Sequence, residues 1–410
     1  TFSSFKEKCD NLSKKLTQYG IGAGDKVAIL SQSMPNWSVA FFSLVPFGRI
    51  AIPILPDSSE NEVTNIINHS ESKVIFVSQK LASKLSQECR DKMTLVIDMD
   101  TFEVIKSDDE KFTCDGKTAV PTPDDIATII YTSGTTGSAK GVVLSHRNLA
   151  SNVITCYHAC KRTKKDRWLS VLPMAHTLEM TLSMLYPMYC GATVYYLPKP
   201  PVPSLLMKAL KVVKPTTMLT VPLIIEKVYK GSVLPTIQKS RTLSWMNEHM
   251  NGLMCRIIGM KLKATFGGHI SFYGIGGAKL DPEVENFLLK AKFPYAIGYG
   301  LTETSPGMSQ TRIDDPDEVR YTTVGRDYEF VDVKVYRTKT VMGCTLRACD
   351  VVSEFLKLAD TSREFHDAIL HHCLCSCECT NALQMPEHYV GLLKLLRHCM
   401  PPIDSFYKIL

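Results

Sequence analysis

Short segments rich in Val, Ile and Leu alternate with segments of helical periodicity between residues 26 and 300 of this chain. Runs such as 26–32 (KVAILSQ) and 72–79 (SKVIFVSQ) predict strands that are buried on both faces of a sheet. Strands that alternate with helices pair in parallel, because each helix serves as the crossover between two strands. We therefore predict an α/β fold with largely parallel sheets.

The same pattern predicts the remaining elements. A helix is predicted over 5–19, where apolar residues recur at helical spacing and Gly20 ends the run. The segment 35–56 predicts a second helix that leads into a strand, and the polar segment 107–125 predicts a linker or surface loop. Further strands are predicted at 94–99, 127–131, 167–174, 192–197, 216–222, 270–277 and 295–300.

Length and composition limit the class of protein. The 410 residues exceed one ordinary hydrophobic core, so we expect two or more domains or subdomains. Hydrophobic residues make up 45% and charged residues 21%, which is typical of a globular chain and excludes a disordered one. The net charge of +6 suits a polyanionic small molecule or an anionic membrane surface. The one dense basic run, 161–165 (KRTKK), is too short for a nucleic-acid face, so we expect a solvated loop and no nucleic-acid partner.

Targeting signals and cysteines bear on location. The chain opens on Thr1, so we expect a fragment or a processed form. It shows no leader and no run of about 20 apolar residues, and the interrupted segment 180–197 predicts buried core. Cysteines scattered over the first 340 residues indicate free thiols in a reducing compartment. We expect a cytoplasmic protein, or one on the cytosolic side of a membrane such as the endoplasmic reticulum, and not a secreted one.

A loop rich in Gly, Ser and Thr separates the predicted strand 127–131 from the apolar segment 141–149. Glycines let backbone N–H groups approach a ligand closely, hydroxyl groups donate hydrogen bonds, and a lysine adds positive charge. This combination favours binding of phosphate oxygens. The candidate phosphate-binding residues are Thr132, Ser133, Gly134, Thr135, Thr136, Gly137 and Lys140.

The loop differs from the GxxxxGK[ST] motif of P-loop NTPases at two positions. Ala139 stands where the second glycine is required, and Gly141 replaces the Ser or Thr after Lys140. That hydroxyl group holds Mg²⁺ in P-loop proteins. A P-loop NTPase is therefore disfavoured.

The stretch 131–146 (YTSGTTGSAKGVVLSH) resembles the phosphate loop of the adenylate-forming, or AMP-binding, superfamily, which includes acyl-CoA synthetases, luciferases and adenylation domains of peptide synthetases. Other stretches resemble further motifs in that family's order, and the first two take the form found in long-chain fatty acyl-CoA ligases. They are LPMAHTLE (172–179), GATVYYLPK (191–199), GIGGAKL (274–280), GYGLTET (298–304) and TVGRDYEFVDVKV (323–335), the last without the family's two prolines. With the opening 1–37, the resemblance covers 1–337.

The resemblance implies the large N-terminal domain of an adenylate-forming enzyme over 1–337, made of stacked α/β subdomains. It implies activation of a long-chain fatty acid by ATP to an acyl-adenylate, followed by ligation to coenzyme A, with Mg²⁺ as the metal. Two alternatives stay open, a ligase for another carboxylate and a catalytically impaired fragment or isoform that binds nucleotide or acyl group. Fatty acid, ATP and CoA are the expected partners, and peripheral membrane association stays open.

Roles for single residues follow from the resemblance. Glu303 would supply an oxygen to Mg²⁺, and Thr302 would donate its hydroxyl to the α-phosphate. Lys140 would hold the β- and γ-phosphates. His176 would lie in the pocket near the acyl and adenylate groups, although a core histidine is the alternative.

The adenine-binding segment is implied in the same way. Gly276, Gly277 and Ala278 would face the base through backbone atoms, and a tight turn between strand and helix is compatible with that role. Tyr299 would stack on adenine or belong to the core, and Gly300 belongs to the segment expected to hold the α-phosphate.

The segment 338–410 departs from the family pattern and loses the strand alternation. It predicts short helices rich in Leu, His and Cys, and it lacks the family's ribose-binding Asp, hinge Arg and catalytic lysine domain. Its run 371–380 (HHCLCSCECT) has C-x-C spacing, unlike the C-x₂-C pairs of structural zinc sites. Soft metals such as Cu(I) or Zn²⁺ are one option for this run. A segment foreign to the family and an appended helical piece are the others.

Overall fold

The computed structural model describes residues 1–108, 116–133, 139–197, 199, 201–311, 324, 326–327, 332–336 and 352–356. For Ser133, Ala139 and the last three ranges, the description covers the backbone alone. The chain divides into two compact units, Thr1–Arg326 and Asp327–Leu410.

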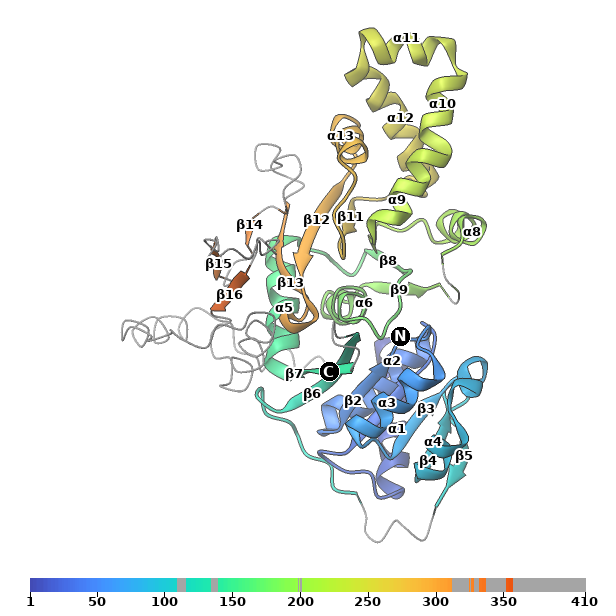
Figure 1. The fold of residues 1–410 in the computed structure, drawn as a ribbon, viewed down its shortest axis with the longest axis vertical. Coiled ribbons are helices and arrows are strands. Elements are labelled where there is room, and N and C mark those ends of the chain that lie inside the picture. The colour runs from blue at the N-terminus through green and yellow to red at the C-terminus, as the bar shows by residue number, and fades with distance from the viewer. Residues whose placement is uncertain are drawn as a thin grey trace, which may run out of the picture. The chain divides into compact units, whose positions relative to one another are not determined.

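The described residues form two seven-stranded sheets, and the first has the order β5-β4-β3-β1-β2-β6-β7 (Figure 1). Its strands are β1 (Lys26–Leu30), β2 (Ile50–Ile54), β3 (Val74–Val77), β4 (Leu95–Asp98), β5 (Val104–Ser107), β6 (Ile126–Ser133) and β7 (Ala139–Ser145). Neighbouring strands are parallel except at the two edges, where β5 and β7 run antiparallel to β4 and β6. The side chains of β2, β3 and β4 are buried throughout, as expected for central parallel strands.

The second sheet has the order β14-β13-β12-β11-β10-β8-β9. Its strands are β8 (Arg167–Ser170), β9 (Thr193–Tyr196), β10 (Thr217–Thr220), β11 (Phe272–Ile275), β12 (Tyr295–Gly300), β13 (Gly307–Gln310) and β14 (Arg326–Asp327). Strands β8 to β12 pair in parallel, whereas β13 returns antiparallel to β12. The predicted α/β fold with largely parallel sheets is confirmed.

Helices pack around the sheets, and all but the first, α1, follow a strand in the chain (Figure 1). Those of the first sheet are α1 (Phe2–Gln18), α2 (Pro35–Leu44), α3 (Glu60–Ser70) and α4 (Gln87–Lys92). Those that follow are α5 (His146–Ala159), α6 (Thr177–Glu179), η4 (Met180–Leu185), α7 (Tyr186–Tyr189), α8 (Pro203–Val213), α9 (Pro222–Val228), η5 (Tyr229–Val233), α10 (Leu234–Lys239), α11 (Arg241–His249), α12 (Asn251–Thr265), α13 (Pro282–Lys290) and η6 (Thr302–Thr304). Among the described residues, no helix combines the length and the apolar character needed to cross a bilayer.

The described part of the second unit is a β-ribbon rather than helix. Strands β15 (Asp332–Tyr336) and β16 (Val352–Leu356) pair antiparallel over five residues. Val352–Leu356 is thus a strand, and the expectation of short helices over 338–410 stays a prediction. Pairing with β15 satisfies the backbone groups of this segment, and Val352 and Phe355 favour strand geometry. The cysteine-rich run 371–380 lies outside the described residues.

Candidate active site

Residues predicted to bind nucleotide follow the carboxyl ends of three strands. The phosphate loop follows β6 of the first sheet, the Gly276–Gly277 turn follows β11, and η6 follows β12 of the second sheet. In open α/β sheets, ligands bind at the carboxyl ends of the strands because the connecting loops converge there. The fold thus brings three of the predicted motifs to the kind of edge where such sites form.

The stem of the phosphate loop is a two-stranded antiparallel ribbon. In its register Thr132 lies opposite Lys140, and Ser133 lies opposite Ala139. Both Thr132 and Lys140 are half-buried. The loop tip, with Gly134, Thr135, Thr136 and Gly137, lies outside the described residues.

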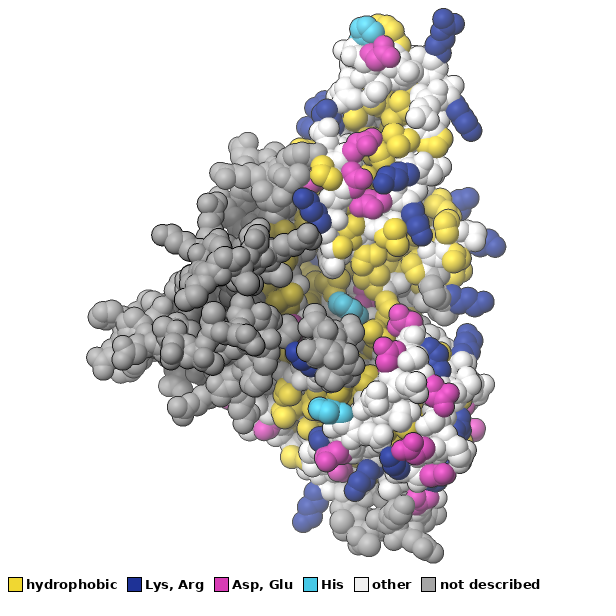
Figure 2. Space-filling model, in the orientation of Figure 1, with side chains coloured by type: hydrophobic (Ala, Val, Ile, Leu, Met, Phe, Trp, Pro, Cys, Tyr) yellow, Lys and Arg dark blue, Asp and Glu magenta, His cyan; other side chains and the backbone are white. Residues whose placement is uncertain are grey.

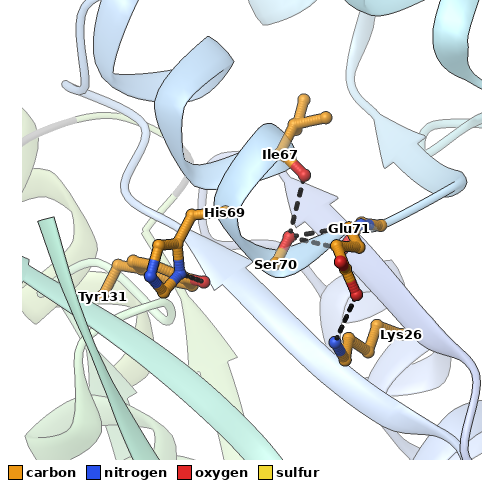
Figure 3. A network of polar contacts seen from close by, with 7 residues as sticks. Lys26, Ile67, His69, Ser70, Glu71 and Tyr131 are labelled. Atoms are coloured by element: carbon orange, nitrogen blue, oxygen red, sulfur yellow. Dashed lines mark hydrogen bonds and ion pairs between the residues drawn. The ribbon is translucent and has the colours of Figure 1, made fainter.

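Tyr131 fastens this stem to α3. Its hydroxyl lies 2.8 Å from His69 Nδ1, and the two rings meet edge to face at 5.6 Å (Figure 3). Burial raises the pKa of Tyr131, so the phenol stays protonated and can donate to His69. The ribbon that presents Lys140 is therefore fixed at its base to the first sheet's own helix.

Strand β7 packs against η6. This contact brings the strand that contains Lys140 to the turn that contains Thr302 and Glu303. Both turn residues are half-buried. The Thr304 hydroxyl shapes the turn, because it accepts from the Leu301 N–H (2.9 Å) and lies within hydrogen-bond distance of the Pro306 carbonyl (2.5 Å).

Asn152, a residue that the sequence analysis missed, ties α5 to the same turn. Its Nδ2 donates to the carbonyls of Thr304 (3.0 Å) and Gly307 (2.9 Å), and its Oδ1 accepts from the Gly307 N–H (3.3 Å). The side chain is 2% exposed. The buried run 148–156 also contains the polar residues Asn148, Ser151 and Thr155, so nothing in the sequence singles out Asn152.

The Gly276–Gly277 turn places its backbone beside the LPMAHTLE segment. A Cβ atom on Gly276 would lie 3.6 Å from both Leu178 Cδ2 and the Gly298 carbonyl, which is ordinary van der Waals contact. Gly277 has φ +83°, a conformation that residues with a side chain rarely adopt. Ala278, the next residue, is exposed.

His176 is the N-cap of α6. Its Nδ1 accepts from the Leu178 N–H at 3.2 Å, so a neutral ring carries its proton on Nε2. The side chain reaches solvent, but the protein packed around it lowers its pKa by desolvation. His176 is therefore neutral at pH 7 and offers one N–H donor at the protein surface.

Tyr299 and Gly300 lie half-buried at the end of β12. Gly300 has a packing reason to be glycine, because a Cβ atom there would overlap the carbonyl of Pro306. Glycine is therefore required at position 300 by packing within the protein, independently of any ligand.

A cavity of about 1110 Å³ lies between the two sheets, and its lining is mainly apolar. From the first sheet, segments after β1, β2 and β3 contribute Ser33, Pro56 and Leu81. The rest comes from segments after β8, β9 and β10 and from helices α8, α9, η5, α10 and α12. Val221, one of the lining residues, lies 3.6 Å from where a Cβ atom on Gly277 would be. The cavity therefore adjoins the predicted adenine turn.

Two polar side chains fix the cavity wall at residues 171–174. The Ser33 hydroxyl donates to the Leu172 carbonyl (2.9 Å) and accepts from the Met174 N–H (3.1 Å), which joins the two sheets. Glu179 is fully buried and accepts from the N–H groups of Val171 (3.0 Å) and Leu172 (3.3 Å). Burial raises the pKa of Glu179 to about 7.

The residues present fit Mg²⁺ held with a nucleotide rather than by the protein alone. Within the described ranges, no group of three or more His, Cys, Asp or Glu side chains could hold a metal ion. Mg²⁺ commonly takes one or two carboxylates together with substrate phosphates. Glu303 has a carboxylate of this kind on η6, which packs against β7, the second strand of the loop stem.

Comparison with known proteins gives matches at the level of family, sequence and fold. A family model described as AMP-binding enzyme matches residues 1–341. The chain is 29% identical over 340 residues to long chain acyl-CoA synthetase 6, peroxisomal, of Arabidopsis thaliana, covering 72% of this chain and 46% of that protein. It is 28% identical over 348 residues to long-chain-fatty-acid–CoA ligase FadD15 of Mycobacterium bovis, covering 76% and 56%. The chain thus spans about half the length of these relatives.

Two solved structures share the fold. One is the N-terminal domain of FACL13 from Mycobacterium tuberculosis, with TM-score 0.64 and 22% identity, covering 82% of this chain and 77% of that one. The other is ATP-bound MatB from Rhodopseudomonas palustris, with TM-score 0.64 and 20% identity, covering 82% and 61%. The family match extends over more than half of the chain, and the motifs occur in the family's order. This chain belongs to the AMP-binding enzyme family.

Proposed function

We propose that this chain forms the large domain of an ATP-dependent long-chain fatty acid–CoA ligase. In this reaction a fatty carboxylate attacks the α-phosphate of ATP, and pyrophosphate leaves as the acyl-adenylate forms. The thiol of coenzyme A then attacks the acyl carbon, and AMP leaves as the thioester forms. The observation that supports it best is the apolar cavity that opens beside the Gly276–Gly277 turn. Curated relatives named as long-chain acyl-CoA synthetases and ligases agree with this substrate class.

The cavity suits an acyl chain. At about 1110 Å³ it exceeds the roughly 300–1,000 Å³ usual for ligand sites. Each buried methylene contributes about 0.8 kcal/mol, so an apolar site of this size favours long chains over short carboxylates. A ligase for a small or charged carboxylate would need polar groups deep in the pocket, and the lining is mainly apolar.

The nucleotide side would act mainly by electrostatic stabilisation. Lys140 and the hydroxyls of the phosphate loop would hold the β- and γ-phosphates, and the Thr302 hydroxyl would donate to the α-phosphate. Glu303 would bind Mg²⁺, which neutralises charge on the phosphate oxygens when bound. His176 would use its Nε2–H near the acyl carboxylate, where its neutral state avoids an unwanted ion pair with the substrate.

Location and membrane contact belong to the same proposal. A long-chain fatty acid dissolves poorly in water and is supplied from lipid. We therefore propose peripheral association with the cytosolic side of a membrane such as the endoplasmic reticulum. Two relatives from Arabidopsis thaliana are named as peroxisomal.

A second candidate function follows from the end of the family match at residue 341. A chain with the phosphate loop, η6 and the cavity would bind ATP and fatty acid without completing the ligation. The two candidates differ in chemistry and share the binding site.

Calorimetric ATP binding and palmitate-dependent pyrophosphate exchange test these proposals. Lys140→Met and Glu303→Gln are expected to weaken Mg²⁺–ATP binding by about 10-fold or more, because each loses a charge-assisted contact. The exposed α1 residues give matched controls, Lys8→Met and Glu7→Gln, which should bind ATP normally. ATP binding without exchange would support the second candidate. Normal binding by both site variants would show that the nucleotide site is wrongly assigned.

A further inference from the structure

The positive charge of this chain is concentrated in one stretch. Residues 199–265 contain eleven Lys or Arg and two Glu, a net charge of +9, whereas the whole chain has +6. The remainder is therefore slightly acidic, at −3. No short run within 199–265 is dense in basic residues, so the asymmetry appears only when the whole stretch is considered.

The same stretch exposes large apolar side chains. It forms α8 to α12, over which Figure 2 shows hydrophobic and basic side chains interspersed on one face. The exposed apolar residues of the stretch are Val202 (53%), Val212 (84%), Leu223 (55%), Trp245 (53%), Met250 (45%), Leu253 (46%) and Met260 (67%). Exposed apolar groups between lysines are typical of surfaces that enter the interfacial layer of a bilayer.

The apolar cavity opens within this region. Four lysines line it, Lys80, Lys199, Lys227 and Lys261, and all four side chains are exposed. A lysine can place its methylene stem along an apolar wall while its ammonium group stays in water. The cavity entrance is therefore bordered by ammonium groups, and Asp57 is the one acidic residue among the described residues of its lining.

Two of the exposed apolar residues, Val202 and Leu223, also line the cavity. They make the path from surface to interior apolar. Few charges nearby compensate the lysines: Lys230 pairs with Asp281 at 3.4 Å, and among the described residues Lys199, Lys227 and Lys261 form no ion pair.

We propose that the face formed by 199–265 docks on an anionic lipid bilayer, with the cavity entrance toward the lipid. The inference rests on the proposed function, because a long-chain acid would then pass from bilayer to cavity without crossing water. Positive charge complements the negative surface of an anionic leaflet, and the apolar side chains insert between headgroups. A nucleic-acid surface would be matched by the charge alone and would leave Leu223 and Val202 without a role.

Vesicle flotation with the full chain tests the docking. We expect binding to phosphatidylcholine vesicles that contain about one third phosphatidylserine, and much weaker binding to phosphatidylcholine alone. The triple variant Lys199→Glu, Lys227→Glu and Lys261→Glu should lose at least about 10-fold in partitioning, since each lysine near an anionic surface is worth roughly 1 kcal/mol.

The matched control is Lys161→Glu, Lys164→Glu and Lys165→Glu. It makes the same change in net charge at exposed positions that do not line the cavity. We expect it to bind anionic vesicles within about 2-fold of wild type. Equal loss in both triple variants, or no binding of the wild-type chain to anionic vesicles, would overturn the proposal.

Two substitutions of exposed apolar residues distinguish insertion into lipid from binding by charge alone. Leu223→Ser should lower partitioning further, whereas Ile105→Ser, with a similar exposure of 54% on edge strand β5, should have no effect. If heparin competes fully and Leu223→Ser binds vesicles normally, the face is a polyanion site and the lipid proposal is wrong. Normal ATP binding by every variant would show that such a failure concerns the docking alone and leaves the proposed function intact.

Discussion

Glu179 shows how one buried side chain links stability to the wall of the apolar cavity. Its carboxyl group holds the N–H groups of Val171 and Leu172, both of which line the cavity. Its other oxygen accepts from the Ser183 hydroxyl at 3.0 Å. Burial raises its pKa from an ordinary 4.5 to about 7, because desolvation penalises the charged form.

This shift predicts a pH dependence of stability. Below pH 4.5 the Glu179 carboxyl is protonated in both the folded and the unfolded state, so no cost of burying a charge exists. As pH rises from 4.5 to about 7, the unfolded chain loses the proton first and the folded state loses stability, by about 3 kcal/mol at most. Glu179→Gln keeps a hydrogen-bond acceptor and stays neutral. Its melting temperature should therefore rise relative to that of wild type as the pH increases across this window. If the melting temperatures of wild type and variant change with pH in the same way between pH 5 and 8, the raised pKa of Glu179 is contradicted.

Two glycines of the site should respond differently to alanine. Gly276→Ala meets only ordinary contacts within the protein, so we expect an unchanged melting temperature and weaker ATP binding, because the methyl group would occupy space expected for the base. Gly300→Ala should lower the melting temperature, because its Cβ overlaps the Pro306 carbonyl. If Gly276→Ala binds ATP as wild type does, the turn does not face the base.

At the scale of elements, α5 positions the turn that contains Glu303. Asn152 makes three hydrogen bonds to the hairpin β12–β13 and so links α5 to that hairpin. The helix itself begins at a capping box between Ser145 and Asn148, directly after β7. The stem of the phosphate loop, the helix α5 and the turn that contains Glu303 are thus joined in a short series of contacts.

Asn152→Ala is expected to weaken Mg²⁺–ATP binding, and to do so more than a control substitution on the same helix. The substitution leaves buried backbone groups of Thr304 and Gly307 without partners, at about 1–3 kcal/mol for each unsatisfied group. Thr155→Ala is the control, since Thr155 is equally buried on α5 but bonds only to Ser151 of its own helix. Calorimetric titration and thermal melting of both variants check this. Equal changes in ATP affinity would assign Asn152 a purely structural role.

At the scale of the whole molecule, the cavity exists because the carboxyl ends of two separate sheets face each other within the first unit. Ser33 joins them through Leu172 and Met174, and Ser38 joins them through a 2.7 Å contact with the Tyr196 hydroxyl. These contacts link residues 139 and 158 positions apart.

Ser33→Ala should therefore lower fatty acid affinity, because residues 172–174 lose their anchor on the first sheet. We expect about a 3- to 10-fold effect, from one or two lost hydrogen bonds of about 0.5–1.5 kcal/mol each. Ser31→Ala is a matched control, because this buried hydroxyl bonds only to the adjacent Gln32 carbonyl. Displacement of a fluorescent fatty acid measures both. Unchanged affinity in Ser33→Ala would mean that the wall does not depend on this bridge.

The sequence by itself determined the strands and the type of sheet. Segments such as β1 and β3 are apolar over a length that suits a buried strand, and that property is local. It also determined the candidate phosphate loop, whose composition has a direct chemical meaning. It did not indicate that β16 pairs with β15.

Only the tertiary structure decided which distant residues meet. Asn152 and Thr304 are 152 positions apart, and nothing in either segment announces their hydrogen bond. The buried state of Glu179 and the cavity between the sheets depend in the same way on packing of remote segments. Periodicity reports which face of an element is apolar, whereas the partner of that face is fixed by the whole chain's packing.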